Sequence, residues 1–235
     1  MLGDSLFRDS MKFGDKVIYG STDDVNINLR KIISVLNENV SKLVLKQEVD
    51  YLLLSLRAIA SYTGVLFDRL ISHQDLPIEY IAISSRNLFE CYLLTAYIIG
   101  NTSKGKEFIS QKAYEELEIN EGFLSIANTN TSETSIKFIR DRMEYIKEIM
   151  KMHEITPSRN WNVSYLAKQT NNELEYKAFF KLYSKYVHPS SWIMNSHNHE
   201  YDNPVFKNIF KLQGQHYVSC ITKLISEYID KKTIT

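Results

Sequence analysis

Apolar residues recur along most of the chain at positions i, i+3, i+4 and i+7, the pattern of amphipathic α-helices. No sustained stretch alternates apolar and polar residues as a half-buried strand does. Only 8 Gly and 4 Pro interrupt this pattern, so the predicted helices are long. The expected fold class is therefore all-α, a single bundle of about seven or eight helices.

Proline and capping residues place the helix boundaries. Pro77, Pro157 and Pro189 stop or start helices, and Asn203 with Pro204 begins the last one. The expected helices cover residues 24–39, 46–72, 78–99, 107–120, 133–153, 164–169, 172–187 and 203 onward. In the first helix, the pattern predicts an inward stripe made by Ile27, Ile32, Val35, Leu36 and Val40.

Composition indicates one soluble domain. With 28 basic and 28 acidic residues the net charge is zero, which argues against a protein that coats nucleic acid. Residues 1–22 are expected to form a flexible arm before a single domain over residues 23–235. The only membrane-like segment, residues 78–99, carries three ionisable residues and is read as a buried helix, so no membrane is expected. Two widely spaced cysteines and no secretory signal favour the cytoplasm.

The helix over 78–99 offers the first candidate site. Arg86 and Glu90 are four residues apart in an apolar helix, so they must find each other or other polar partners. They form either a structural ion pair or part of a polar pocket. In the preceding helix, Arg57 and Ser61 share a polar face that either meets solvent or lines a ligand cleft opposite Arg86.

The segment from Trp161 to Trp192 ends a helix with Tyr183, Ser184 and His188. An imidazole at a helix C-terminus is a candidate general acid or base, or simply a cap. The candidate catalytic residues are thus His188, Arg86, Glu90 and Tyr183, and the candidate ligand-binding residues are Arg57, Ser61 and Ser184.

A metal site is the weaker alternative for the histidines. His188, His197 and His199 would supply three imidazoles, but loops of this composition are more often solvated turns. No Gly-rich phosphate loop, G-x-S-x-G elbow, H-E-x-x-H or C-x-x-C motif occurs in the sequence. We therefore expect no cofactor and no resident metal.

Three segments carry a family resemblance: RNLFECYLL (86–94), WNVSYLAKQT (161–170) and FFKLYSKYVHPSS (179–191). Together they resemble an uncharacterised bacterial all-helical family, the domain-of-unknown-function family 5677. Its pattern has an R-x-x-x-E helix, here Arg86 and Glu90, and a later Y-S-x-x-V-H-P segment, here residues 183–189. The match spans roughly residues 46–192 and implies no activity.

A more distant resemblance is to the HEPN superfamily of helical bundles, which includes ribonucleases of toxin and antiphage systems. Their active site is an Arg and a His with four to six residues between them, whereas in this chain Cys91 stands at the His position nearest in register after Arg86. The resemblance implies a metal-independent ribonuclease. Because the motif histidine is missing, the base would have to come from another helix, and our hypothesis is that His188 takes the 2′-hydroxyl proton while Arg86 or Arg57 stabilises the phosphate. Two alternatives stay open: a non-enzymatic, homodimeric module that senses a small ligand, and a metal-dependent hydrolase.

Overall fold

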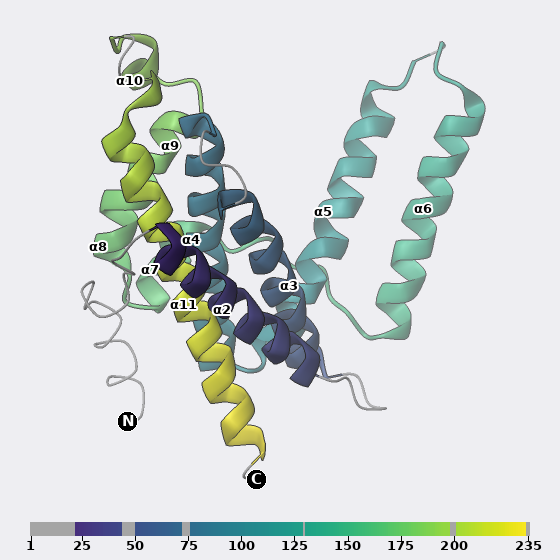
Figure 1. Cartoon of the computed structure of the whole chain (residues 1–235). Coiled ribbons are helices and arrows are strands. Elements are labelled where there is room, and N and C mark those ends of the chain that lie inside the picture. Colours follow the sequence, from purple (N-terminus) through teal and green to yellow (C-terminus); the bar gives the residue numbers. More distant parts are fainter. Residues whose placement is uncertain (1–21, 44–49, 72–75, 129, 198–200, 234–235) are drawn as a thin grey trace.

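The computed structural model of the chain describes residues 22–43, 50–71, 76–128, 130–197 and 201–233 (Figure 1). Every regular element in these ranges is helical, which confirms the all-α prediction. The arm expected over residues 1–22 lies outside the described residues except for Thr22, and so does the expected helical start from 46 to 49.

Six long helices account for most of the described fold: α2 (Thr22–Lys42), α3 (Tyr51–Ile71), α4 (Ile78–Gly100), α5 (Lys104–Ile126), α6 (Glu133–Met152) and α11 (Pro204–Thr233). Shorter elements lie between α6 and α11: α7 (Val163–Gln169), α8 (Glu173–Glu175), a π-helix (Tyr176–Phe180), α9 (Lys181–Val187) and α10 (Ser191–Met194).

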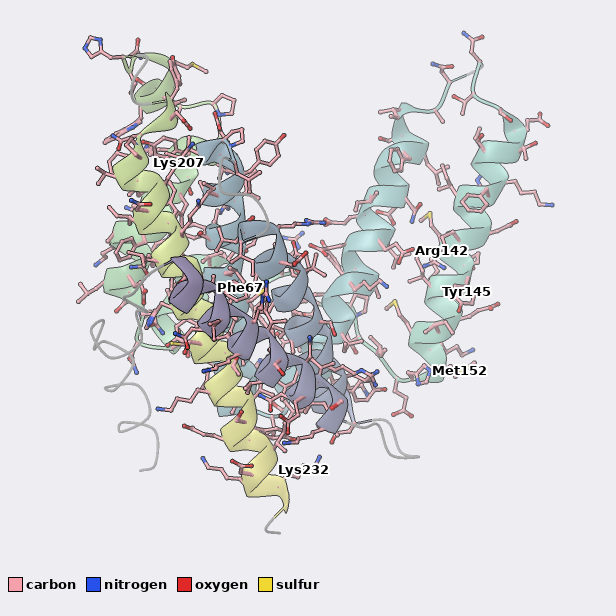
Figure 2. All side chains as sticks on the ribbon, in the orientation of Figure 1. Phe67, Arg142, Tyr145, Met152, Lys207 and Lys232 are labelled. Carbon is pink, nitrogen blue, oxygen red and sulfur yellow. The ribbon has the colours of Figure 1, made fainter. Side chains whose placement is uncertain are left out.

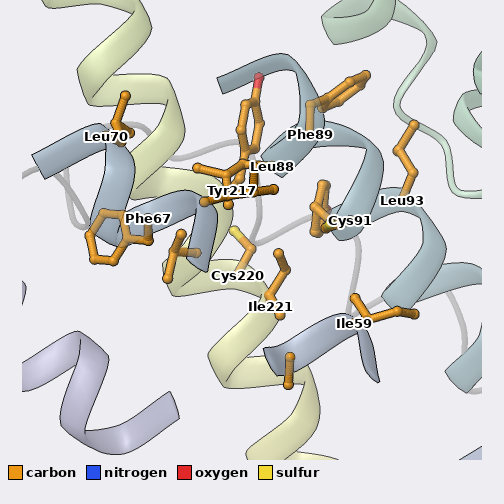
Figure 3. Close-up of a cluster of buried hydrophobic side chains, with 14 of the residues drawn as sticks. Ile59, Phe67, Leu70, Leu88, Phe89, Cys91, Leu93, Tyr217, Cys220 and Ile221 are labelled. Carbon is orange, nitrogen blue, oxygen red and sulfur yellow. The ribbon is translucent and has the colours of Figure 1, made fainter. Parts of the chain in front are cut away.

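Helix α4 is the centre of the bundle. It packs against α3, α7, α9 and α11, and most of its residues are buried. Ser85 donates a hydrogen bond to the Phe210 carbonyl of α11 at 2.7 Å, which joins the two most extensively packed helices. Around this contact, aromatic and aliphatic side chains from α3, α4 and α11 form the core, including Phe67, Phe89, Tyr217 and Ile221 (Figure 3).

The predicted inward face of α2 was partly wrong. Ile27 and Val35 are exposed, whereas Leu29, Leu36 and Leu43 are buried. The face is rotated because Asn39 turns inward and donates hydrogen bonds to the Thr222 carbonyl and to Ser226 Oγ of α11. A buried amide has to be satisfied, and this requirement sets the helix orientation.

Two further boundaries differ from expectation. Helix α5 continues past residue 120 to Ile126, because packing against α6 supports its last turns despite Gly122. The helix expected over 172–187 is interrupted by the π-helix, and the short α10 was not predicted. Pro77 and Pro204 stand at the helix starts where the sequence places them, and α7, expected from residue 164, begins at Val163 after the cap residue Asn162.

The α5–α6 hairpin projects away from the rest of the bundle (Figure 1). Helix α6 packs on α5, and its side chains Met143, Ile146 and Met150 are buried. Tyr145 and Met152 lie on the same projecting helix and are more than half exposed (Figure 2). Within the described residues, no helix combines the length and apolarity needed to cross a membrane.

The hairpin is held to the bundle where α5 crosses the first turn of α3. A Cβ added at Gly105 would lie 2.8 Å from both Cα and N of Leu52, and Ser55 Oγ lies 3.0 Å from the Gly105 carbonyl oxygen. Only a residue without a side chain permits this backbone approach.

We therefore expect Gly105→Ala to lower the free energy of unfolding by about 1–3 kcal/mol, because the clash is with backbone that cannot rotate away. Gly122→Ala in the same helix has no atom within 4 Å of its new Cβ and should instead add about 0.5–1 kcal/mol. Urea unfolding of both variants checks this, and equal stabilities for the two would contradict the close approach.

Candidate functional site

Three polar residues of α4, Arg86, Asn87 and Glu90, form a strip on a side of the helix that its neighbours leave partly open. Arg86, Asn87 and Glu90 are half-buried there, with side-chain exposures of 22% for Arg86 and 31% for Glu90. Arg86 Nε lies 3.3 Å from Glu90 Oε1, one helical turn away. The structure thus brings together the two charges that the sequence pairs, without sealing them beneath other helices.

His188 joins this strip from α9. Pro189 disfavours helical geometry at the residue before it, so the helix ends at Val187 and His188 is extended, with φ −116° and ψ 148°. The exposed imidazole turns to α4, where its Nε2 lies 2.9 Å from Arg86 Nη1. A guanidinium can only donate, so Nε2 accepts with its lone pair and the ring proton lies on Nδ1.

The third partner of Arg86 is an aromatic ring. Arg86 Cζ lies 4.7 Å from the centroid of Phe180, the last residue of the π-helix. A cation–π contact of this kind contributes about 0.5–2 kcal/mol, depending on how far it is shielded from water. Ser184 Oγ donates to the Phe180 carbonyl at 2.9 Å, which satisfies the backbone at the point where the wide turn ends.

Glu90 is held in an environment that disfavours its charge. Desolvation raises the pKa of this carboxyl, and the charge and hydrogen bonding of Arg86 offset only part of that effect. A ligand that donates hydrogen bonds to the carboxylate would compensate the lost hydration.

Two adjoining cavities open beside Glu90. One, of about 420 Å³, is lined mainly by apolar groups of α3, α4 and α5, with Asn87 and Glu90 as its polar lining side chains. The other, of about 360 Å³, extends toward Trp161 and α7. Both share the lining residues Ala58, Glu90, Leu94 and Phe108.

Trp161 closes the far end of the second cavity. Its indole Nε1 donates to Glu107 Oε1 at 2.7 Å, and Lys104 Nζ lies 2.5 Å from the other carboxylate oxygen. Burial alone would raise the pKa of Glu107, but these donors outweigh it and lower the pKa.

Three predicted site residues do not belong to this strip. Arg57 and Ser61 are exposed and line neither cavity, because the neighbouring face of α3, with Ala58 and Tyr62, turns toward α4 and α5. Ser184 uses its hydroxyl for the Phe180 carbonyl within its own helix. Of the two readings that the sequence left open for Arg57 and Ser61, the structure has the one in which their face meets solvent.

Tyr183 was expected beside His188 and is instead fully buried. Its ring packs edge-on against Phe210, with centroids 5.0 Å apart. Burial raises the pKa of its hydroxyl, as it does for Tyr217 nearby. Tyr183 therefore belongs to the core and lies too deep to meet a substrate at the strip.

The proposed histidine metal site finds no support in the described part of the chain, where no group of three or more potential ligands converges. His188 uses one ring nitrogen for Arg86, and His197 is exposed. His199 lies outside the described residues.

Glu175, next to the π-helix, provides a test of the core around Tyr183. Burial raises the pKa of its carboxyl, with only a partial offset from Tyr217. The folded state then holds the proton more tightly than the unfolded chain, so stability falls as the pH rises above the ordinary glutamic acid value, until the pH passes the raised folded pKa.

We expect Glu175→Gln to be more stable than the wild type at pH 7.5 and to lose that advantage toward pH 4. Urea unfolding at both pH values measures this, with exposed Glu173→Gln as the matched control. A Glu175→Gln variant that is destabilised equally at both pH values would contradict the assigned burial effect.

Comparison with known proteins identifies a family. Residues 70–204, more than half of the chain, match the "Family of unknown function (DUF5677)", and the matched region contains Arg86, Asn87, Glu90, Phe180 and His188. Searches of curated proteins and of solved structures gave no match. The chain is a member of the DUF5677 family.

Proposed function

We propose that this protein is a metal-independent ribonuclease in which His188 is the general base and Arg86 stabilises the charged phosphate. The observation that carries the proposal is the 2.9 Å contact between Arg86 Nη1 and His188 Nε2 at a partly open surface. The contact keeps an unprotonated imidazole nitrogen beside a permanent positive charge, which are the two groups that cleavage by the ribose 2′-hydroxyl requires.

The reaction follows from the contact. A substrate phosphate draws the Arg86 guanidinium toward its oxygens, which frees the Nε2 lone pair of His188. Nε2 takes the proton of the 2′-hydroxyl as that oxygen attacks the adjacent phosphorus. The bond from phosphorus to the 5′-oxygen breaks, a 2′,3′-cyclic phosphate forms, and the 5′-oxygen takes a proton from the imidazolium or from water.

Basic residues near His188 support an RNA substrate. Lys181 and Lys185 are exposed on α9 at i, i+4 spacing, so they share one face of the helix. His188 directly follows the last residue of this helix. Lys177 is exposed one turn earlier. A local row of this kind binds a phosphate backbone even though the chain as a whole is uncharged.

The resemblance to HEPN ribonucleases fits this proposal with one change. Their Arg and His come from a single helix, whereas here the Arg comes from α4 and the His from the end of α9. We extend the proposal to the role that the resemblance implies, a toxin or antiphage component, and to a homodimer, which sedimentation of the purified protein tests.

A second candidate function is a non-enzymatic module that binds a small ligand. The two adjoining cavities of about 420 and 360 Å³ favour it, since they fall in the size range of small-molecule sites and are mainly apolar with few polar groups.

The ribonuclease proposal predicts cleavage of a mixed RNA pool in EDTA, with 2′,3′-cyclic phosphate ends on the products. His188→Ala should lower the rate about 10²- to 10⁴-fold, because the base is lost. Arg86→Ala and Arg86→Lys should each lower it about 10²-fold or more, since neither restores the planar donor group.

Arg140→Ala on α6 and His153→Ala at the residue that caps α6 are the matched controls and should keep the wild-type rate. Thermal unfolding followed by circular dichroism establishes that each variant is folded. Cleavage that survives His188→Ala, or that requires added zinc or manganese, would overturn the proposal.

A further inference from the structure

The 420 Å³ cavity beside Glu90 has apolar and aromatic walls and a separate polar edge, an arrangement that suits a planar aromatic ligand. Most of its wall is apolar, formed by Ala58, Ile59, Cys91 and Leu94. Two aromatic rings, Tyr62 from α3 and Phe108 from α5, stand in the wall from different helices. Walls of this kind accept a flat ring by stacking and by exclusion of water.

The polar lining comes from one side only. Asn87 and Glu90 are three residues apart on α4, so they stand next to each other on the same face of the helix. Glu90 offers two carboxylate oxygens, and Oε1 lies 3.3 Å from Arg86 Nε. Asn87 adds an amide that both donates and accepts.

Cys91 is not a reactive group of this cavity. Burial raises the pKa of its thiol to about 12, so the thiolate that nucleophilic chemistry needs is absent at neutral pH. Polar contact with a ligand in this cavity therefore falls to Asn87 and Glu90.

We propose that this cavity binds a guanine base, with Glu90 and Asn87 contacting its Watson–Crick edge. Guanine presents two adjacent N–H donors, at N1 and N2, which match the two oxygens of a carboxylate. Its neighbouring O6 accepts a hydrogen bond, which matches the Asn87 amide. Adenine, cytosine and uracil lack this pair of donors, so they leave the desolvated Glu90 incompletely satisfied.

The position of the cavity gives guanine binding a role in catalysis. Glu90 lines the cavity and also contacts Arg86, which in turn contacts His188, so one continuous row of side chains joins the base site to the phosphate site. Resting on the proposed ribonuclease function, the inference extends to the substrate: single-stranded RNA is cut on the 3′ side of guanosine.

Binding tests the cavity without reference to cleavage. Isothermal titration compares guanosine 3′-monophosphate with the inosine, adenosine and cytidine equivalents. The guanine nucleotide should bind about 10- to 100-fold more tightly than the others, because each of them loses at least one of the paired donors. Glu90→Gln should remove most of this preference, since an amide supplies one acceptor in place of two.

Two further variants keep the test specific. Asn87→Ala should weaken guanine binding less than Glu90→Gln does, and Glu148→Gln on α6 should not change it. Thermal unfolding identifies any variant that fails to fold. Equal affinity for all four nucleotides, or a preference that survives Glu90→Gln, overturns the inference.

Cleavage of defined RNA oligonucleotides separates this inference from the ribonuclease proposal. Oligonucleotides with a single guanosine should be cut after it, and replacement by inosine should slow the cut about tenfold or more. Cleavage without base preference overturns the guanine site and leaves the ribonuclease intact. Guanine binding that is lost with Glu90→Gln, together with no cleavage of any RNA, supports the site and identifies the free nucleotide as its ligand.

Discussion

The burial of α4 is the constraint on which the rest of the structure depends. Helices α3, α7, α9 and α11 cover most of its surface, so its charged side chains can lie only along the strip that remains. An unpaired guanidinium there would be costly, because it is largely removed from water. Glu90, His188 and the ring of Phe180 surround Arg86, and each comes from a different position in the chain, although Arg86 Nε is left without a well-aligned hydrogen bond. The polar strip is thus a consequence of how the bundle covers its central helix.

The π-helix is the local device that completes this arrangement. A π turn holds an extra residue, so it changes which side chains of the following helix face inward. Phe180 ends the π turn beneath Arg86, while Tyr183, three residues later, points into the core against Phe210. Ser184 stabilises the transition through its bond to the Phe180 carbonyl. In a regular helix these side chains would adopt a different register, and the support under Arg86 would be lost.

Local signals in the sequence were enough to predict the long helices and the pairing of Arg86 with Glu90. Proline positions fixed the starts of α4 and α11 and the end of α9, and i, i+4 spacing paired Arg86 with Glu90. The contact with His188 joins residues 102 positions apart, so no local spacing predicts it. The same is true of the cavities, whose walls come from α3, α4 and α5, and of the depth of Tyr183, which depends on a π turn that propensity does not encode. Asn87 and Tyr62 were missed because their role depends entirely on these tertiary contacts.

Under the proposed ribonuclease function, the charges and hydrogen bonds of the strip explain how it would bind a phosphate. Arg86 is positive, Glu90 can balance that charge when it is ionised, and His188 accepts a hydrogen bond without carrying a charge at Nε2. An incoming phosphate adds negative charge and competes with both neighbours for the guanidinium. Glu90 competes poorly with the phosphate for the guanidinium, because desolvation disfavours its charge and its Oε1 lies 3.3 Å from Arg86 Nε without a well-aligned hydrogen bond. In the proposed ribonuclease, the guanidinium therefore turns to the phosphate, and the His188 nitrogen that it leaves takes the proton of the 2′-hydroxyl.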